Sequence, residues 1–260
     1  MGPLLQLKKH APSGTIVLNR PEKRNALSRD LIAELRQALS DFHLERSVRA
    51  VILTGAGTAF CAGMDLGEMR ATSELEDPHP QWYDDAVTYR DLMTELLEFP
   101  KPIIAAVNGP AIAGGLGLVL ACDLVLAAKD AAFGLPEPRR GIVAGIVAPL
   151  LHFRIGGSQS ARLLLTAQSI SAAEAHRVGL AHELVATDLV WARAHELAVE
   201  VAKSAPEALQ LTKQVLNQTI GEHLQTLLTA GAAASAAART TEAAQEGLAA
   251  FLEKREPRWR

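Results

Sequence analysis

The residues best suited to chemistry in this chain fall in three short segments. Two are glycine-containing loops that follow apolar runs of strand length, TGAGTAFCAGMDLGEM at Thr54–Met69 and NGPAIAGGLGL at Asn108–Leu118. The third, FGLPEPRRGI, carries Glu137 between two prolines, which restrict the backbone and hold the carboxylate in place. A carboxylate in a water-poor cleft has a raised pKa and can transfer protons near neutral pH. The alternative is a solvated loop glutamate paired with one of the two arginines that follow it.

The pair Gly114-Gly115 indicates a second kind of chemistry. A helix predicted over Gly114–Cys122 would begin at this pair. The unpaired N–H groups at a helix start, together with the helix dipole, favour a bound anion. Ala113 and the two glycines leave no bulk to block a ligand from the backbone. The alternative is that the glycines form only a tight turn or a packing point.

Several sequence signatures of cofactor and catalytic sites match this chain only in part. Gly55-Ala-Gly57 follows a predicted strand, but Phe60 stands where a dinucleotide fingerprint needs a small residue. The chain has no Gly-Lys pair for a phosphate loop and no zinc-helix histidine pair. Cys61 and Cys122 lack ligand partners at metal spacing, so we expect both to be small buried residues. No metal or redox cofactor is predicted.

Composition narrows the class of protein. The chain has 260 residues, 48% of them hydrophobic, which is enough for a full core in one or two domains. Charged residues are 21% of the chain and the net charge is −3, which argues against disorder and against a nucleic-acid partner. Two cysteines and no recognisable signal peptide favour a cytoplasmic location. The longest apolar stretch, Ala111–Cys122, is too short and glycine-rich to span a bilayer, so no membrane partner is expected.

The elements that must position these segments alternate between strand and helix in the first two-thirds of the chain. Four near-continuous apolar runs predict strands covered on both faces: Thr15–Asn19, Ala50–Thr54, Ile103–Val107 and Leu124–Ala127. Helices are predicted over Ser28–His43, with Ser28 as N-cap, and over Ala86–Phe99. The alternation predicts an α/β class.

From Ser158 onward the pattern predicts helices and no strand. Ser171 begins a capping-box pattern, Pro206 can open a helix, and the alanine-rich stretch Gly231–Ala250 strongly favours helix. Arg70–Asp85, acidic and with two prolines, is predicted to be a mobile surface loop.

Taken together, the motifs resemble the crotonase superfamily, the enoyl-CoA hydratase/isomerase family. The matching segments occur in the right order over nearly the whole chain: LNRPEKRNALS (Leu18–Ser28), AFCAGMDLGEM, NGPAIAGG, ARLLLTAQSISAAEAHRVGL (Ala161–Leu180) and EGLAAFLEKREP (Glu246–Pro257). The resemblance implies a spiral of ββα turns over residues 1–195 and a helical C-terminal region, 196–260, for trimerisation. It also implies a homotrimer or a dimer of trimers.

The chemistry that the resemblance implies is stabilisation of a CoA-thioester enolate. The family pattern assigns the two oxyanion-binding N–H groups to Met64 and Gly114, and the acid/base role to Glu137. The second glutamate of the hydratases is missing, because Gly117 occupies its place. Simple hydration is therefore in doubt. A glutamate introduced at 117 is expected to raise it if the helix presents the carboxylate to the cleft, without destabilising the helix itself, and with overpacking beside the acyl chain as the risk. The identity of the acyl chain would depend on Arg70–Asp85.

The CoA part of the substrate is expected to contact two segments. Lys23 and Arg24 are the favoured candidates for its phosphates, and the alternative is a solvated pair before a helix. The family also binds the adenine near main-chain groups at four positions: Asn25, Ala26, Asp65 and Leu66.

We therefore expect an acyl-CoA enzyme of the hydratase/isomerase type with one catalytic carboxylate and no separate cofactor. The alternatives are a 3-enoyl-CoA isomerase, an acyl-CoA hydratase-lyase, or an acyl-CoA-binding protein that has lost catalysis. Gly117 favours the last of these, whereas the retained Glu137 and both loops argue against it.

Overall fold

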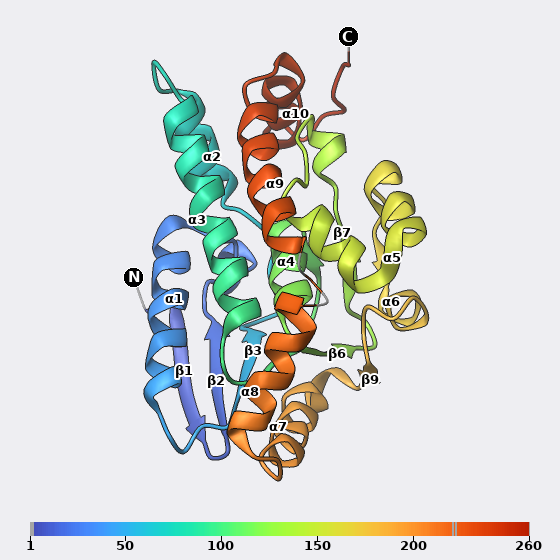
Figure 1. The fold of residues 1–260 in the computed structure, drawn as a ribbon. Helices are drawn as coiled ribbons and strands as arrows, with labels where there is room; N and C mark the ends of the chain where they lie inside the picture. The colour runs from blue at the N-terminus through green and yellow to red at the C-terminus, as the bar shows by residue number, and fades with distance from the viewer. Residues whose placement is uncertain (1–2, 220, 222, 260) are drawn as a thin grey trace.

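The strands of the computed structural model, which describes residues 3–219, 221 and 223–259, form two sheets (Figure 1). The larger has the order β1-β2-β3-β4-β6-β9 and is parallel except for the β1–β2 pair. Its strands are β1 (Leu5–His10), β2 (Ser13–Leu18), β3 (Ala50–Gly55), β4 (Ile103–Val107), β6 (Leu124–Ala128) and β9 (Glu183–Val185). The smaller sheet contains β5 (Ala111–Ile112), β7 (Ala132–Gly134) and β8 (Ile170–Ser171).

Successive turns of the chain repeat one pattern. Strand β4 joins the large sheet, β5 joins the small one, and α4 (Gly114–Ala121) follows. The next turn places β6 in the large sheet and β7 in the small one, and then adds α5 (Val147–Thr166). This is the predicted spiral of ββα turns.

Helices cover both faces of the large sheet, as the buried runs of β2, β3 and β4 require. On one face of β2, Gly14 packs against the Phe42 ring of α1 (Arg29–Leu44), where a Cβ atom would lie 2.7 Å from that ring. Thr15 faces the other way, and its hydroxyl accepts from Trp191 of α7 (Val190–Val201) at 3.0 Å. Consecutive residues of a strand point to opposite faces, so α1 and α7 lie on opposite sides of the sheet.

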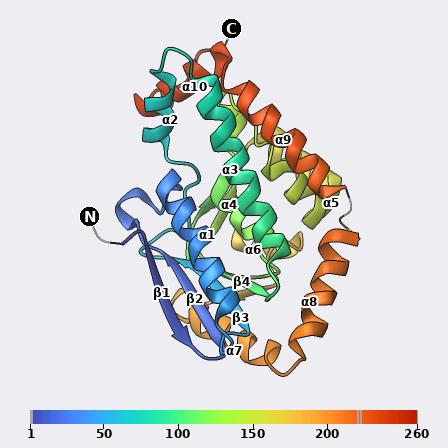
Figure 2. The same ribbon diagram turned by 60° about the vertical axis from the view of Figure 1, so that its left-hand side comes forward.

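Several of the remaining helices pack against one another beside the sheets. Helices α3 and α9 lie side by side in both ribbon views, and α10 lies near α2 at one end of the molecule (Figures 1 and 2). Their bounds are α2 (Leu66–Ser73), α3 (His79–Glu98), α6 (Ala172–Arg177), α8 (Pro206–Gln214), α9 (Leu224–Ala238) and α10 (Glu242–Leu252). The predicted boundary at 195/196 falls within α7, and the division into two regions stays a prediction.

Most of the local predictions are confirmed. All four predicted strands are present. Ser28 caps α1 by accepting from the Leu31 N–H at 3.2 Å, and Ser171 caps α6 in the same way. Pro206 is the first residue of α8.

Three predictions are wrong or incomplete. Two strands do follow Ser158, but β8 has two residues and β9 has three, too few to show a periodic pattern. The predicted loop Arg70–Asp85 is largely helical, because its prolines stand at the start of α3, where proline is compatible with a helix. The alanine-rich stretch is two helices, α9 and α10, with Thr241 capping the second.

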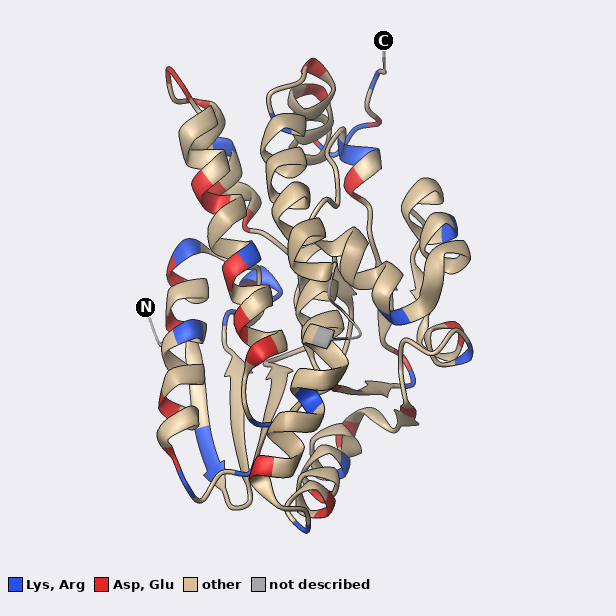
Figure 3. Ribbon diagram, viewed as in Figure 1, with Lys and Arg blue, Asp and Glu red and all other residues tan. Residues whose placement is uncertain are grey.

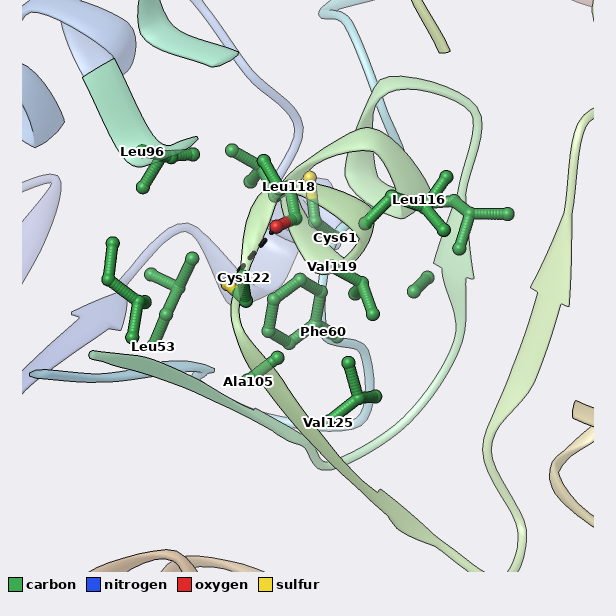
Figure 4. Close-up of a cluster of buried hydrophobic side chains, with 14 of the residues drawn as sticks. Leu53, Phe60, Cys61, Leu96, Ala105, Leu116, Leu118, Val119, Cys122 and Val125 are labelled. Atoms are coloured by element: carbon green, nitrogen blue, oxygen red, sulfur yellow. Dashed lines mark hydrogen bonds between the residues drawn. The ribbon is translucent and has the colours of Figure 1, made fainter. Parts of the chain in front are cut away.

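The structure confirms the prediction that both cysteines are buried. Cys61 and Cys122 are buried among apolar side chains, and the Cys122 thiol donates to the Leu118 carbonyl at 3.1 Å (Figure 4). Burial raises the pKa of each thiol to about 12.

Charged residues are interspersed along the elements, with Lys and Arg close to Asp and Glu (Figure 3). Asp123 has a structural role: it accepts from the Ile103 N–H and pairs with the buried Lys213 of α8 at 2.7 Å. Within the described residues, no helix combines the length and the apolar character that a membrane crossing needs. The same residues contain no group of three or more side chains placed to hold a metal ion.

Candidate active site

The two glycine-containing loops meet because they follow neighbouring parallel strands, β3 and β4. Cys61 and Ala111 form an isolated parallel bridge, and the Ile112 N–H donates to the Cys61 carbonyl at 2.9 Å. A Cβ atom on Gly115 would lie 2.2 Å from that carbonyl oxygen. The contact between the loops therefore requires glycine at 115.

The bridge places the Met64 and Gly114 backbones in one site. A Cβ atom on Gly63, whose φ is +92°, would lie 3.1 Å from the Gly114 nitrogen. Leu27 pairs with the first loop through the Gly63 carbonyl and the Asp65 N–H, so the Met64 N–H points away from that pairing. Neither the Met64 nor the Gly114 N–H donates to an atom of the described residues. Two donors are thus left for a ligand, one of them at the start of α4.

Glu137 is positioned by the turn that follows β7. Pro136 precedes a 3-10 turn over Glu137–Arg140, and the glutamate side chain is buried, with 6% of the residue exposed. Burial raises the pKa of its carboxyl group from 4.5 to about 7. Its Oε2 has no hydrogen-bond partner among the described residues.

The alternative of a solvated, paired glutamate is wrong. The Arg139 guanidinium points elsewhere and donates to the Thr166 carbonyl at 3.1 Å. Within the described part of the chain, neither Arg139 nor Arg140 forms an ion pair with Glu137. The carboxyl is therefore available to a ligand in the cavity.

Met64, Gly114 and Glu137 line one cavity of about 60 Å³, together with Tyr89 of α3. A second cavity of about 260 Å³ lies between α2 and α10 and shares five lining residues with the first. They are Leu66, Met69, Arg140, Ile142 and Arg239. The larger space is near the lower end of the range for small-molecule sites, about 300–1,000 Å³. The smaller cavity can hold a reacting group, and the larger one adjoins it and is lined by both apolar and charged side chains.

Tyr89 fills the space beside Gly117, a feature that the sequence did not reveal. A Cβ atom at 117 would lie 2.0 Å from the Tyr89 hydroxyl oxygen and 3.1 Å from Val147. The hydroxyl donates to the Gly114 carbonyl at 2.6 Å, and burial raises the pKa of the phenol well above 10. The expectation that 117 accepts a glutamate without strain is therefore wrong, because a tyrosine occupies the volume that the new side chain needs.

The residues expected to contact CoA lie on two segments that pair with each other. Lys23 and Arg24 are exposed at a short 3-10 turn, Pro21–Lys23. Asn25 is fully buried, and its amide nitrogen donates to the Ala59 carbonyl at 2.8 Å. Its side chain is thus part of the scaffold, and only its backbone is left for a ligand.

Arg20 is a residue of this region that the sequence analysis did not single out. Its guanidinium donates to the Ala26 carbonyl at 2.6 Å and to the Asp65 carboxylate at 2.8 Å. Asp65 also caps α2 by accepting from the Gly67 N–H at 2.9 Å. Burial alone would raise the pKa of Asp65, but the hydrogen bonds from Arg20 and Gly67 outweigh it and lower the pKa. The position of Arg20 within Leu18–Ser28, the segment expected to contact CoA, was the sequence signal that could have identified it.

Comparison with known proteins agrees with this architecture. The enoyl-CoA hydratase/isomerase family profile matches residues 10–260. The chain is 41% identical to a Thermus thermophilus protein assigned to the enoyl-CoA hydratases, over 94% of this chain and 96% of that one. It is 37% identical to the 2,3-dehydroadipyl-CoA hydratase of Escherichia coli, over 93% and 92%. The crystal structure of an enoyl-CoA hydratase from Mycobacterium avium superposes with a TM-score of 0.88 at 31% identity and covers all of both chains. The chain therefore belongs to the enoyl-CoA hydratase/isomerase family of the crotonase superfamily, and it is an acyl-CoA enzyme of that family.

Proposed function

We propose that this enzyme moves a proton on an enoyl-CoA thioester, with Glu137 as the acid/base and the Met64 and Gly114 N–H groups as the oxyanion donors. The observation that carries the proposal is the shared cavity. It holds a buried carboxyl group whose pKa is about 7 and two backbone donors without protein acceptors. Enolate chemistry requires a group that accepts and donates a proton near neutral pH. It also requires hydrogen-bond donors beside the oxygen on which negative charge develops.

The simplest reaction for this arrangement is the isomerisation of a 3-enoyl-CoA. The Glu137 carboxylate removes a proton from the α-carbon, and the C–H electron pair moves into the thioester to form a dienolate. The N–H groups of Met64 and Gly114 bind the negatively charged thioester oxygen. Protonated Glu137 then returns the proton at the γ-carbon, which leaves a 2-enoyl-CoA and restores the carboxylate.

Isomerisation is favoured over hydration because Glu137 is the only carboxyl-bearing side chain that lines this cavity among the described residues. Hydration needs a water that is both oriented and activated, a task that two carboxylates divide in the hydratases. Position 117 cannot supply the second one while Tyr89 occupies the space beside it. Addition–elimination on a substrate that brings its own polar group is the second candidate, for the same reason.

CoA binding in this proposal uses the exposed Lys23 and Arg24 for phosphates. The backbone near Asn25, Ala26, Asp65 and Leu66 lies beside them, held together by Arg20. The names of the relatives include short-chain enoyl-CoA and 2,3-dehydroadipyl-CoA, so family membership leaves the acyl group open.

The test compares wild type with Glu137→Gln on 3-enoyl-CoA and crotonyl-CoA. The substitution is nearly isosteric and removes only the titrating group. We expect turnover to fall about 100- to 10,000-fold, while the dissociation constant of a saturated acyl-CoA is unchanged. In the wild type, isomerisation should be faster than crotonyl-CoA hydration.

Two outcomes would contradict the proposal. A loss of turnover below about tenfold in Glu137→Gln would place the proton transfer on another residue. Acyl-CoA binding by a wild type that turns over none of a panel of 2-enoyl, 3-enoyl and aryl-acyl thioesters would instead support the non-catalytic alternative.

A further inference from the structure

Three buried polar side-chain atoms in the described part of the chain lack a hydrogen-bond partner. They are Oε2 of Glu137, Nε1 of Trp82 and one terminal nitrogen of Arg239. All three residues line the two adjoining cavities described above. An unpaired buried donor costs about 1–3 kcal/mol, so such groups concentrate where a ligand completes them. Two of the three are donors, which calls for an acceptor ligand.

Arg140 adds a second cation to the same place. It lines both cavities, as Arg239 does, and its guanidinium stacks on the Phe251 ring with 4.2 Å to the ring centroid. Stacking uses the flat face of a guanidinium and leaves its N–H edge free to bind a planar oxyanion. Neither Arg140 nor Arg239 forms an ion pair or a side-chain hydrogen bond with a described residue.

The neighbouring carboxylates are already neutralised by other cations. Glu74 pairs with Arg70, and Glu253 pairs with Arg255. Asp85 is held by Arg29, which donates to both of its oxygens. Among the described residues that line the two cavities, the third carboxyl is Glu137, which is only partly ionised at neutral pH because burial raises its pKa to about 7. The two cavity arginines therefore lack a counterion of their own.

We propose that the acyl chain of the substrate carries an oxyanion at its far end, a carboxylate, which Arg239, Arg140 and the Trp82 N–H bind in the chamber between α2 and α10. The thioester lies at Glu137, and an apolar chain leads from there along Leu66, Met69 and Ile142 to the cationic end. This inference rests on the proposed function, because it places the acyl group in the cavity of Glu137.

A CoA phosphate offers the same oxyanion chemistry, and the experiment separates the two sources. The acyl carboxylate is favoured because both arginines line the cavity of the reacting centre, whereas the expected phosphate contacts, Lys23 and Arg24, do not line it. A phosphate ligand would serve every acyl-CoA equally, whereas an acyl carboxylate would distinguish one class of substrate from another.

The first measurement needs only the wild-type protein. Calorimetric titration with saturated acyl-CoAs, which cannot react, compares an ω-carboxyacyl-CoA with the ω-methyl thioester of equal length. We expect the ω-carboxy ligand to bind about 10- to 100-fold more tightly at the best chain length, as hydrogen bonds to a charged group predict. Failure of every acyl-CoA to bind would overturn the proposed function as well, whereas equal binding of the pair would overturn only this inference.

Variants then identify the residues. Arg239→Met should remove the preference for the ω-carboxy ligand and leave the ω-methyl affinity unchanged. Trp82→Phe keeps an aromatic side chain but replaces the indole with a smaller phenyl ring and removes its N–H, and it should weaken only the ω-carboxy ligand, by about 2- to 10-fold. Arg177→Met, a change to an exposed arginine outside both cavities, is the matched control and should have no effect.

Two results would contradict the assignment of the arginines. If Arg239→Met weakens free CoA and both acyl-CoAs by the same factor, Arg239 binds a CoA phosphate. If it lowers the sedimenting mass while the ω-carboxy preference persists, Arg239 serves contact between copies of the chain. Thermal unfolding of each variant checks that it is folded. If Arg239→Met does not fold, the comparison of ω-carboxy and ω-methyl ligands on the wild type still decides the class of ligand.

Discussion

Glu137 shows how burial alone shifts the pKa of an ordinary side chain toward neutral pH. No described cation pairs with it, and one of its oxygens has no partner, so the charged form is poorly solvated. Its pKa rises from 4.5 to about 7 for this reason. Near neutral pH the protonated and ionised forms are both populated, which suits a group that must take and return a proton.

The rate of isomerisation should follow the ionisation of Glu137. Since the carboxylate removes the α-proton, we expect kcat/KM to rise with pH, with a midpoint near the pKa of about 7. A pH–rate profile with a 3-enoyl-CoA measures this. A profile that stays flat across neutral pH would show that another group limits the rate.

The same raised pKa predicts a pH-dependent stability. The folded protein favours protonated Glu137, so this contribution is complete below about pH 4.5 and is lost as the pH rises through about 7. Glu137→Gln is neutral at every pH. Relative to wild type it should therefore gain stability through that window, by up to about 3 kcal/mol above pH 7. Denaturant unfolding at a series of pH values checks this, and a pH-independent difference would contradict it.

Gly117 and Tyr89 should behave as a coupled pair. Gly117→Ala places a methyl group 2.0 Å from the Tyr89 hydroxyl oxygen, and we expect a loss of about 1–3 kcal/mol in the free energy of unfolding from overpacking. In a Tyr89→Phe background the nearest ring atom is 3.2 Å away, so the same change should cost much less.

A double-mutant cycle over these two positions measures the coupling. Gly157→Ala, next to the kink of α5 at Gly156, would meet only the His152 side chain at 3.2 Å and is a control for an added methyl group that no hydroxyl opposes. Additive free-energy changes at 89 and 117 would show that α4 shifts away from Tyr89 and that position 117 can after all accept a side chain.

At the level of elements, the site depends on segments that pair outside the two main sheets. The Ala62 N–H donates to the Arg24 carbonyl at 3.0 Å, and Leu27 bridges Met64. The proposed CoA segment and the first glycine-containing loop are therefore one structural unit. Its conformation requires positive φ at Arg24 and Asn25, which the buried Asn25 amide stabilises by binding the 56–60 turn.

The exposed cations of this unit should contribute to binding and little to catalysis. Lys23→Ala with Arg24→Ala is expected to raise KM and weaken the dependence of affinity on salt, with kcat nearly unchanged, because phosphate contacts act on ground and transition states alike. Titration with CoA at several salt concentrations tests this, with the exposed Lys203→Ala as a control. Unchanged affinity at low salt would show that the pair is only solvated.

For the whole molecule, the trimer that the family resemblance implies stays a prediction, and an exposed apolar surface on the C-terminal helices is a place to test it. Leu211 and Val215 lie four residues apart and are 62% and 52% exposed. Side chains at this spacing share one face of a helix, and an exposed apolar face commonly marks an interface. We propose that a second copy of the chain covers this face.

Sedimentation analysis tests the assembly. The wild type should sediment as a trimer or a hexamer, and Leu211→Glu should shift the distribution to smaller species, while Glu207→Gln on the same helix should not. If the wild type is a monomer, or if Leu211→Glu leaves the mass unchanged, this face is not the interface.

Much of this protein was determined by its sequence alone. The apolar runs of Ala50–Thr54 and Ile103–Val107 are strands because continuous burial requires apolar residues at every position. Ser28 and Ser171 cap helices because their hydroxyls accept an N–H three residues ahead. Such features depend on neighbours in the chain, and the ordered loop motifs were enough to indicate the family that the comparisons show.

How the site is closed depends on the packing of segments that are distant in the chain. Tyr89 beside Gly117, Arg20 between Ala26 and Asp65, and the unpaired donors of Trp82 and Arg239 all depend on contacts between distant segments. No local periodicity predicts such contacts. The packing of α3, α4 and α9 sets those of Tyr89, Trp82 and Arg239, and the pairing of the segment around Ala26 with the start of α2 sets those of Arg20. The sequence thus determined which groups are available for chemistry, whereas packing decided which are buried, which are paired, and which remain free for a ligand.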